Sequence, residues 1–295
     1  AEAPSIDSPA ILTALLADMP YELYWFDKSD GGMGATSVLG FECGEDRDGE
    51  YICVDPEAMY QFSFTVDSAY AAGEFKVDST TGTRVSSAIA TAENVASSAS
   101  GTPSEQLASF KDYICNAVSY DEDAAAGNAA NGDPWQLISV FDGDSSTNVV
   151  CEGYAKAFKY LCDLADIDGV GRILVSGDMN GGEGAGAHMW NIVNMDNGYN
   201  YLVDVTNCDE GTIGAPAQLF LAIPTSGSYD SAYLFTCDGG TITYTYDSDT
   251  TSVFASRDLI LADVEYMSPA YLPEGGEYFL DGDGINHLYF PLTID

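Results

Sequence analysis

The chain has 295 residues, 46% of them hydrophobic, which is enough for one large domain or two ordinary ones with a real core. Nine Lys and Arg stand against 47 Asp and Glu, and the formal net charge is −38. A surface of this sign repels phosphate groups, which argues against nucleic acid and anionic membranes as partners. No apolar run approaches the ~20 residues needed to cross a bilayer, so membrane insertion is not expected.

The acidity has two interpretations. The simpler is a solvated surface, suited to high salt or to a calcium-rich exterior; the other is a set of acidic clusters that select cationic substrates. The opening residues, AEAPSIDSPA, are small and polar, as in a mature protein whose export signal has been removed. Seven cysteines are many for a cytosolic enzyme, so we expect a secreted or cell-surface-attached protein.

In chain order, residues 9–19 predict a short helix, and residues 51–78 contain strand-like runs broken by Gly, Pro and Asp. The Ala- and Ser-rich stretch 83–101 predicts a second helix. Directly after it, the run Thr-Pro-Ser-Glu at 102–105 combines a capping residue, a first-turn proline and a capping box. The helix that follows has an apolar face made by Leu107, Phe110, Ile114 and Val118.

The loop VSYDEDAAAGNAANGDP separates this helix from another that starts at Cys151. Three strands follow, in GRILVSG, HMWNIVNM and YNYLVDVT, and the chain from about residue 226 is rich in strand signals: TITYTY, LILADVEY and HLYFPLTI. The helix from Cys151 has an apolar stripe of Ala155, Phe158, Leu161, Cys162 and Ala165.

An odd number of cysteines leaves at least one unpaired within a monomer, and Cys151 is the candidate. Cys43 and Cys53 flank the turn-rich GEDRDGEYI, so a disulfide between them could bridge a hairpin. Cys208 and Cys237 could close a loop in the same way, although spacing alone does not fix the connectivity.

Cys151 lies at or near the first turn of its helix. Unsatisfied N–H groups and the positive end of the helix dipole favour a thiolate there, and Gly153 leaves room for a substrate backbone beside the sulfur. A small buried hydrophobe at a helix start is the structural alternative. A nucleophilic thiol also needs a base and a group that orients the base.

The chain has only two histidines as candidates for that base. His287, in GINHLYF, is interpreted as a surface or structural residue, whereas His188 opens the strand HMWNIV. If a loop of three or five residues is centred on Asp196, His188 lies directly opposite Asp204 and on the same sheet face. A two-residue turn at Asn-Gly 197–198 would put the two side chains on opposite faces, so the hypothesis requires the odd loop.

Three blocks of this sequence, NVVCEGYAKAFKYL, HMWNIV and YNYLVDVTNCDEG, resemble the three blocks of the transglutaminase-like superfamily. This superfamily has a papain-like fold and includes transglutaminases and secreted bacterial cysteine peptidases. FKDYICNAVSYD is similar to the helix and Tyr-Asp pair that precede that core, and ILTALLADMPYELYWF is similar to the opening of secreted bacterial members. The resemblance covers roughly residues 100–222, and the order Cys, His-x-Trp-Asn, Asp-x-Thr is its specific part.

The resemblance implies an α+β fold, with a papain-like core in which the nucleophile helix packs on an antiparallel sheet, and with β-rich flanking regions. We expect an N-terminal α+β region at residues 1–100, a catalytic core at 101–225 and a C-terminal β-rich region at 226–295, or one compact unit made of all three.

The resemblance also implies residue roles: Cys151 is the nucleophile, His188 the general base and acid, and Asp204 the orienting group. Such an enzyme forms a thioester with an acyl group from a peptide bond or a glutamine side chain of a peptide or protein substrate. Water or an amine completes the reaction, and hydrolysis by a peptidase or amidohydrolase is slightly favoured over transglutamination. The alternative is a non-catalytic acidic surface, adhesion or calcium-binding module on the same fold. The oligomeric state is open.

Two departures from the family pattern bear on substrate preference. Asn-Cys-Asp at 207–209 stands where the family often has Trp and an acid, and the polar FDGDSSTN replaces a short Gly-rich lead before Cys151. The backbone N–H of Cys151 is the expected first donor to an oxyanion, and Gln136 is a candidate for the second.

No cofactor is required by this chemistry. Four acidic pairs resemble the start of a calcium loop, but none continues with the ligand spacing and closing Glu of an EF-hand, so they are interpreted as solvated turns and calcium binding stays open. A His-based zinc site is not expected with so few histidines. The pairs are Asp46/Asp48, Asp142/Asp144, Asp247/Asp249 and Asp281/Asp283.

Overall fold

The computed structural model divides the chain into two compact units, Ala1–Thr83 and Arg84–Asp295, and each is described by itself. Both contain helices and antiparallel strands, which confirms the predicted α+β class. No described helix is long and apolar enough to cross a membrane. The structure describes residues 7–19, 22–27, 33–45, 49, 51–73, 76–78, 82–127, 137–263, 277–280 and 286–289.

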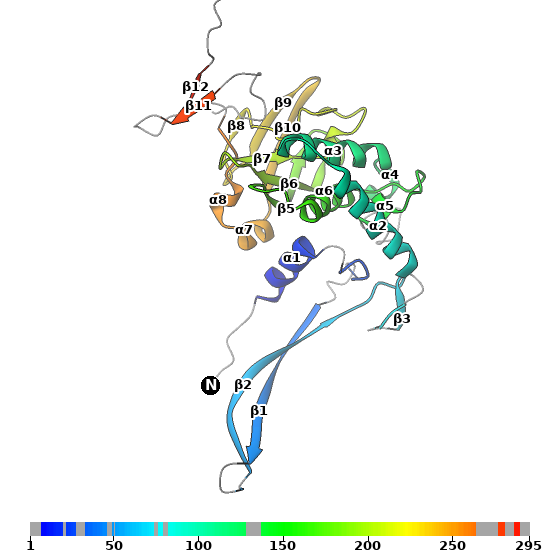
Figure 1. Ribbon diagram of the computed structural model, residues 1–295, viewed down its shortest axis with the longest axis vertical. Helices are drawn as coiled ribbons and strands as arrows, with labels where there is room; N and C mark the ends of the chain where they lie inside the picture. The colour runs from blue at the N-terminus through cyan, green and yellow to red at the C-terminus, as the bar shows by residue number, and fades with distance from the viewer. Residues whose placement is uncertain are drawn as a thin grey trace, which may run out of the picture. The chain divides into compact units, whose positions relative to one another are not determined.

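The first unit contains the predicted helix, α1 (Ser8–Asp18), and a long hairpin of β1 (Met33–Glu45) and β2 (Tyr51–Phe64), drawn as a curved ribbon in Figure 1. The backbone register of this hairpin pairs Cys43 with Cys53, and the disulfide between them stays a prediction. The separate strand runs predicted between residues 51 and 64 form one continuous strand. Pro56 lacks an N–H group, and the strand continues past it because the pairing register shifts there in a bulge. Two short strands follow, β3 (Ala71–Gly73) and β4 (Lys76–Val77).

The second unit is built on a six-stranded antiparallel sheet with the order β7-β6-β5-β10-β9-β8. Two three-stranded meanders meet where β10 pairs with β5, so strands from before and after residue 226 share one sheet. The predicted three-part domain division stays a prediction. The strands are β5 (Gly171–Asn180), β6 (Gly186–Asn194), β7 (Asn200–Val203), β8 (Ser226–Gly227), β9 (Tyr233–Cys237) and β10 (Gly240–Tyr246).

The helix α6 (Cys151–Ala165) packs on β5 and β6 and contacts α3 (Pro103–Ala117) and α5 (Ile138–Phe141). Its burial extends beyond the predicted stripe, because Lys156 and Lys159 are also buried, each paired with a carboxylate four residues away. The helix α3 begins with the predicted capping box. The other helices are α2 (Gly82–Ser98), α4 (Glu122–Ala125), η2 (Thr206–Cys208), α7 (Ser248–Val253) and α8 (Ser256–Leu259).

The predicted strand LILADVEY is wrong in its described part. Its first residue ends α8, and residues 260–263 are irregular, with Leu261 and Ala262 buried against the sheet edge where Ala262 donates to the Asn200 carbonyl. Farther on, β11 (Glu277–Leu280) pairs with β12 (Asn286–Tyr289), and His287 lies on β12.

The suggested Cys208–Cys237 disulfide is also wrong. Both thiols are free and buried in separate elements, Cys208 in η2 and Cys237 at the end of β9. Cys115, Cys151 and Cys162 are free as well. Disulfides therefore give no support to the expected oxidising exterior in the part of the second unit that the structure describes.

Candidate active site

Cys151 is the first residue of α6 and is half-buried. The residue before it, Val150, is extended and contributes no side-chain cap, so the N–H groups of the first turn point out of the helix end without a capping side chain. The expectation that Gly153 leaves room for a substrate is wrong. A Cβ at this buried glycine would lie 2.6 Å from Cβ of Val149. Gly153 therefore allows Val149, two residues before α6, to pack against the first turn of that helix.

His188 is on β6, and its Nε2 atom lies 2.9 Å from Oδ2 of Asp204, which directly follows β7. The loop between these strands has five residues, 195–199, as the odd-loop hypothesis requires, but it is centred on Asn197. Continued by one residue from the Asn191–Val203 pair, this register sets Asp204 across from Trp190. The carboxylate therefore reaches His188 diagonally, on the same sheet face.

Four hydrogen bonds hold the Asp204 carboxylate in a fully buried position. Oδ2 accepts from His188, from Nδ2 of Asn207 at 2.9 Å and from the Tyr244 hydroxyl at 2.7 Å, while Oδ1 accepts from the Asn207 backbone at 3.2 Å. Asn207 also accepts from the backbone N–H of Glu183 at 2.8 Å, so one amide joins Asp204 to the loop before β6.

The pKa values of His188 and Asp204 are both shifted in the directions that favour an ion pair between them. Burial alone would lower the pKa of His188, but the Asp204 charge and hydrogen bond, together with a hydrogen bond and charge from Cys151, raise it above the ordinary histidine value. Burial alone would raise the pKa of Asp204, but His188 and the hydrogen bonds from Tyr244 and Asn207 hold it below its usual value. Asp204 therefore stays ionised, and His188 readily carries a proton.

Nδ1, the second ring nitrogen of His188, is the one available to Cys151, because Nε2 is engaged by Asp204. It is buried and has no hydrogen bond of ordinary geometry to a described residue. Cys151 nevertheless contributes to the raised pKa of His188, after the larger contribution from Asp204.

Tyr120 lies beside the start of α6, because its backbone forms a parallel bridge with Val149. Two hydrogen bonds fix this bridge, from Val149 N–H to the Ser119 carbonyl at 3.2 Å and from Asp121 N–H to the Val149 carbonyl at 3.0 Å. The Tyr120 hydroxyl lies against Gly184, where a Cβ would come within 2.5 Å of it. Burial first, and then the nearby Cys151 and carboxylates, raise the pKa of Tyr120, so its hydroxyl remains a donor.

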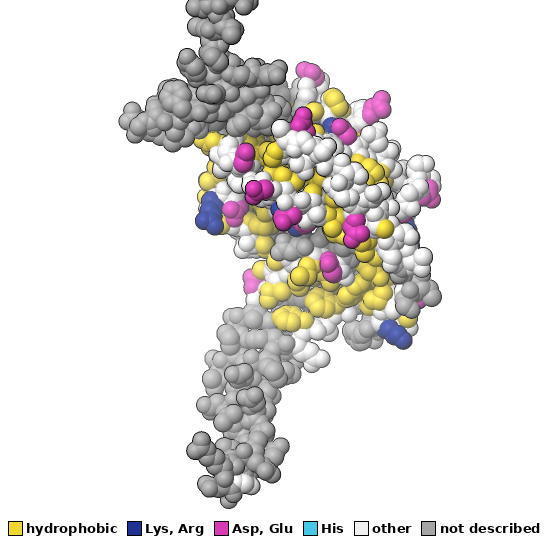
Figure 2. Space-filling model, viewed as in Figure 1, with side chains coloured by type: hydrophobic (Ala, Val, Ile, Leu, Met, Phe, Trp, Pro, Cys, Tyr) yellow, Lys and Arg dark blue, Asp and Glu magenta, His cyan; other side chains and the backbone are white. Residues whose placement is uncertain are grey.

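A pocket of about 760 Å³ opens beside this cluster and includes Tyr120, Glu183, Cys208 and Asp209 in its wall. Tyr154 of α6 donates to Asp209 at 2.7 Å and fixes that side of the pocket. Burial and the neighbouring carboxylates Glu122 and Asp209 raise the pKa of Glu183, which indicates negative potential at the pocket. Elsewhere acidic side chains are scattered over the surface, as Figure 2 shows for one face.

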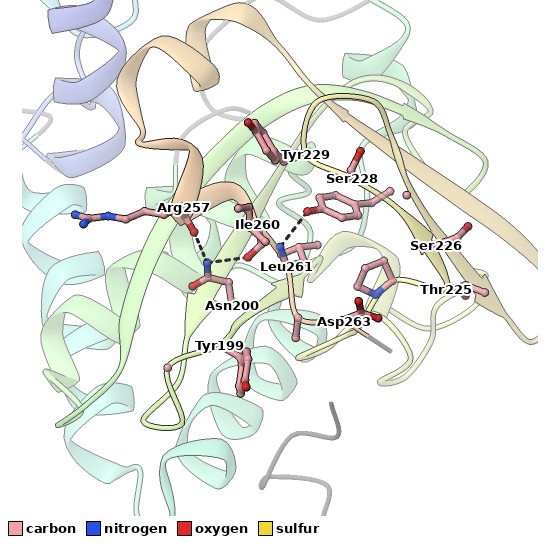
Figure 3. Close-up of a pocket in the computed structure, with 15 residues that line it drawn as sticks. Tyr199, Asn200, Thr225, Ser226, Ser228, Tyr229, Arg257, Ile260, Leu261 and Asp263 are labelled. Carbon is pink, nitrogen blue, oxygen red and sulfur yellow. Dashed lines mark hydrogen bonds between the residues drawn. The ribbon is translucent and has the colours of Figure 1, made fainter. Parts of the chain in front are cut away.

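A second pocket of about 600 Å³ lies where β7 begins, away from Asp204 at the other end of that strand (Figure 3). Several of its polar wall groups are bonded to one another. Asn200 donates to the carbonyls of Arg257 and Ile260, and the Leu261 N–H donates to the Tyr233 hydroxyl. Cys151, His188 and Asp204 line neither this pocket nor the one of about 760 Å³, whose wall comes nearest to them through Tyr120 and Glu183.

The remaining predicted site residues have other positions. Gln136 lies outside the described residues. Asp247 caps α7 and accepts from Ser176, and Asp142 accepts from Arg84 and Thr147, so these carboxylates have protein partners. Within the described part of the chain, no group of three or more His, Cys, Asp or Glu is arranged to hold a metal ion.

Comparison with known proteins adds little. Neither a protein-family model nor a curated protein matches the sequence. The chain is similar to a crystal structure of a TGase, with 16% identity and a TM-score of 0.34 over 71% of this chain and 50% of that one. The chain thus spans half the length of this structure.

Proposed function

We propose that the protein is a thiol-dependent acyl-transfer enzyme with a transglutaminase-like, papain-type core, in which Cys151, His188 and Asp204 act together. The observation that supports this most directly is the buried His188 ring, bonded to Asp204 through Nε2 and influenced by the Cys151 side chain. A base held by a carboxylate on one side and facing a thiol on the other is the arrangement that nucleophilic cysteine chemistry needs.

In the proposed reaction, the Cys151 sulfur attacks the carbonyl carbon of an amide, and His188 takes the thiol proton. The oxyanion that forms accepts hydrogen bonds from the Cys151 backbone N–H, at the uncapped end of α6, and from the Tyr120 hydroxyl. The carbon–nitrogen bond then breaks, His188 gives its proton to the leaving nitrogen, and a thioester remains. Water or an amine then attacks the thioester carbonyl carbon while His188 takes a proton from it. The carbon–sulfur bond breaks, and His188 passes that proton to the departing Cys151 sulfur.

The substrate is proposed to be a peptide or protein amide, with hydrolysis slightly favoured over amine transfer, and the enzyme is proposed to act outside the cell. The test is a mass-spectrometric screen of a peptide library with and without an added primary amine. Cleavage, deamidation and amine incorporation each give a distinct mass change. The proposal predicts at least one of them in the wild type and none in Cys151→Ala, with that variant still folded.

Failure to detect any of these products, together with slow alkylation of Cys151, would favour the non-catalytic binding module. The same products from Cys151→Ala would also overturn the proposal, because no other described residue is assigned the role of nucleophile.

A further inference from the structure

Tyr244 reaches the Asp204 carboxylate from β10, 40 residues later in the chain. Its backbone is in register with Met179 of β5 on one side and Tyr233 of β9 on the other. A strand paired on both sides cannot move without breaking ladder hydrogen bonds, so the Cα position of Tyr244 is fixed relative to the strands that hold the candidate site.

The ring of Tyr244 is also fixed, because three aromatic rings enclose it. Ring centroids lie 5.1 Å away for Trp190, 5.5 Å for Phe235 and 6.3 Å for His188, and only 1% of Tyr244 is exposed. A buried ring in such packing has few orientations open to it. The hydroxyl is therefore aimed at one place, which is Oδ2 of Asp204.

The Tyr244 hydroxyl remains protonated over the whole useful pH range. Burial, and then the Asp204 charge and hydrogen bond, raise the pKa of Tyr244 well above its ordinary value. The hydrogen bond in turn contributes to the lowered pKa of Asp204. The proton of this 2.7 Å bond thus stays on the tyrosine, and the carboxylate stays ionised.

We propose that Tyr244 is a positioning residue for the acyl transfer, because its hydroxyl holds Oδ2 of Asp204 toward Nε2 of His188 and so leaves Nδ1 for Cys151. The inference rests on the proposed function. Tyr244 acts only through Asp204 in this scheme. Without the hydroxyl, the carboxylate loses one of the three donors on Oδ2, is more easily protonated and can turn away from the imidazole.

Tyr246 provides a matched control two residues along the same strand. Its ring stacks on Trp190 at 5.9 Å, and its hydroxyl donates to the Leu259 carbonyl at 2.9 Å. Tyr244→Phe and Tyr246→Phe each remove one hydroxyl hydrogen bond beside Trp190, but only the first removes a bond to Asp204. If Tyr244 served only to fill the core, both variants would leave His188 unchanged. Equal melting temperatures would show that both remain folded.

The first readout is the acid titration of the His188 ring signal by NMR, which senses protonation of Asp204 and needs no enzymatic activity. The chain has two histidines, so His287→Gln assigns the signals. Among the described residues, the titratable groups that interact electrostatically with Asp204 include His188, Tyr244, Cys208 and Tyr120. The last three have raised pKa values and do not titrate in acid; the Cys151 thiol, which faces His188, is removed in a Cys151→Ala background.

The acid inflection is expected at higher pH in Tyr244→Phe than in the wild type, and at the wild-type position in Tyr246→Phe. An unchanged inflection in Tyr244→Phe, or the same displacement in both variants, would overturn the inference.

The second readout is turnover of a substrate from the library screen. We expect Tyr244→Phe to lower kcat about tenfold with KM unchanged, as for loss of one hydrogen bond to a charged group. A displaced inflection with unchanged kcat would overturn the positioning role. If the wild type has no activity but the NMR inflection still moves in Tyr244→Phe, the proposed function fails, and with it the role of Tyr244 in that reaction. The NMR result would still establish the hydrogen bond between Tyr244 and Asp204.

Discussion

His188 and Asp204 form a pair that is fully hidden from solvent, with 2.9 Å between Nε2 and Oδ2. Replacing Asp204 with Asn would keep the shape but present an amide, which favours the wrong imidazole tautomer. We expect kcat to fall by a factor on the order of 10³ to 10⁴, measured on a substrate from the library screen. Asp178→Asn, which removes an exposed carboxylate on β5, is the control. Full activity in Asp204→Asn would refute the orienting role of Asp204.

The same pair predicts how stability depends on pH. The raised pKa of His188 gives stability that is complete below the ordinary histidine pKa of about 6.5 and declines as pH rises through the folded value of about 10. The lowered pKa of Asp204 gives stability that is complete above the ordinary aspartate pKa of about 3.9 and is lost in stronger acid. Urea unfolding at a series of pH values should show the advantage of wild type over His188→Gln as largest between these two ordinary values. An advantage that grows toward pH 10 would contradict the assigned charges.

Alkylation kinetics test the contact between His188 and Cys151. Iodoacetamide should modify Cys151 first among the five free thiols that the structure describes, because burial raises the pKa of the other four. His188→Ala should slow this reaction about tenfold or more, and His287→Ala should leave it unchanged. Peptide mapping after short exposure gives the rate at each site. Equal rates in wild type and His188→Ala would mean that the ring does not activate the sulfur.

Local signals predicted much of the second unit. The capping box at Thr102 and Glu105 fixes where α3 begins, and the alternation around the 195–199 loop predicts that His188 and Asp204 share a face. The predicted pairing differs from the observed one by two residues, because the loop is centred on Asn197 and not on Asp196, and an even shift keeps both side chains on one face. Turn residues in NMDNG allow both centres, and only the packing of the sheet decides between them.

The partners of the site come from parts of the chain that local patterns do not connect. Tyr244 alternates with Tyr246 in TITYTY, which predicts a strand face, but only the β10–β5 pairing brings that strand to Asp204. Asn207 stood out as a departure from the family pattern, yet its bonds to Asp204 and Glu183 depend on the η2 turn. Contacts of this kind need the tertiary fold.

A substitution of Tyr120 tests whether its hydroxyl acts in the chemical step, measured by kcat, or in substrate binding, measured by KM. Its hydroxyl would bond the oxyanion and not the planar ground-state amide, so Tyr120→Phe should lower kcat by a factor on the order of 10² with little change in KM. Tyr113→Phe is the control, because it removes a tyrosine hydroxyl from a ring that stacks on Phe141 and is given no role in the proposed reaction. A rise in KM with unchanged kcat would assign Tyr120 to substrate binding instead.

Gly153 gives a test of the fold at the start of α6 that needs no substrate. In an ordinary helix, replacing glycine by alanine stabilises by up to about 1 kcal/mol. Here the new methyl would lie 2.6 Å from Cβ and 2.9 Å from Cγ2 of Val149, so the start of α6 would have to shift. We expect Gly153→Ala to lower the free energy of unfolding by about 1–3 kcal/mol, the range for overpacking, and to slow alkylation of Cys151. A more stable Gly153→Ala protein would show that Val149 does not pass beneath the helix, and the Tyr120 bridge to Val149 would then lose its support as well.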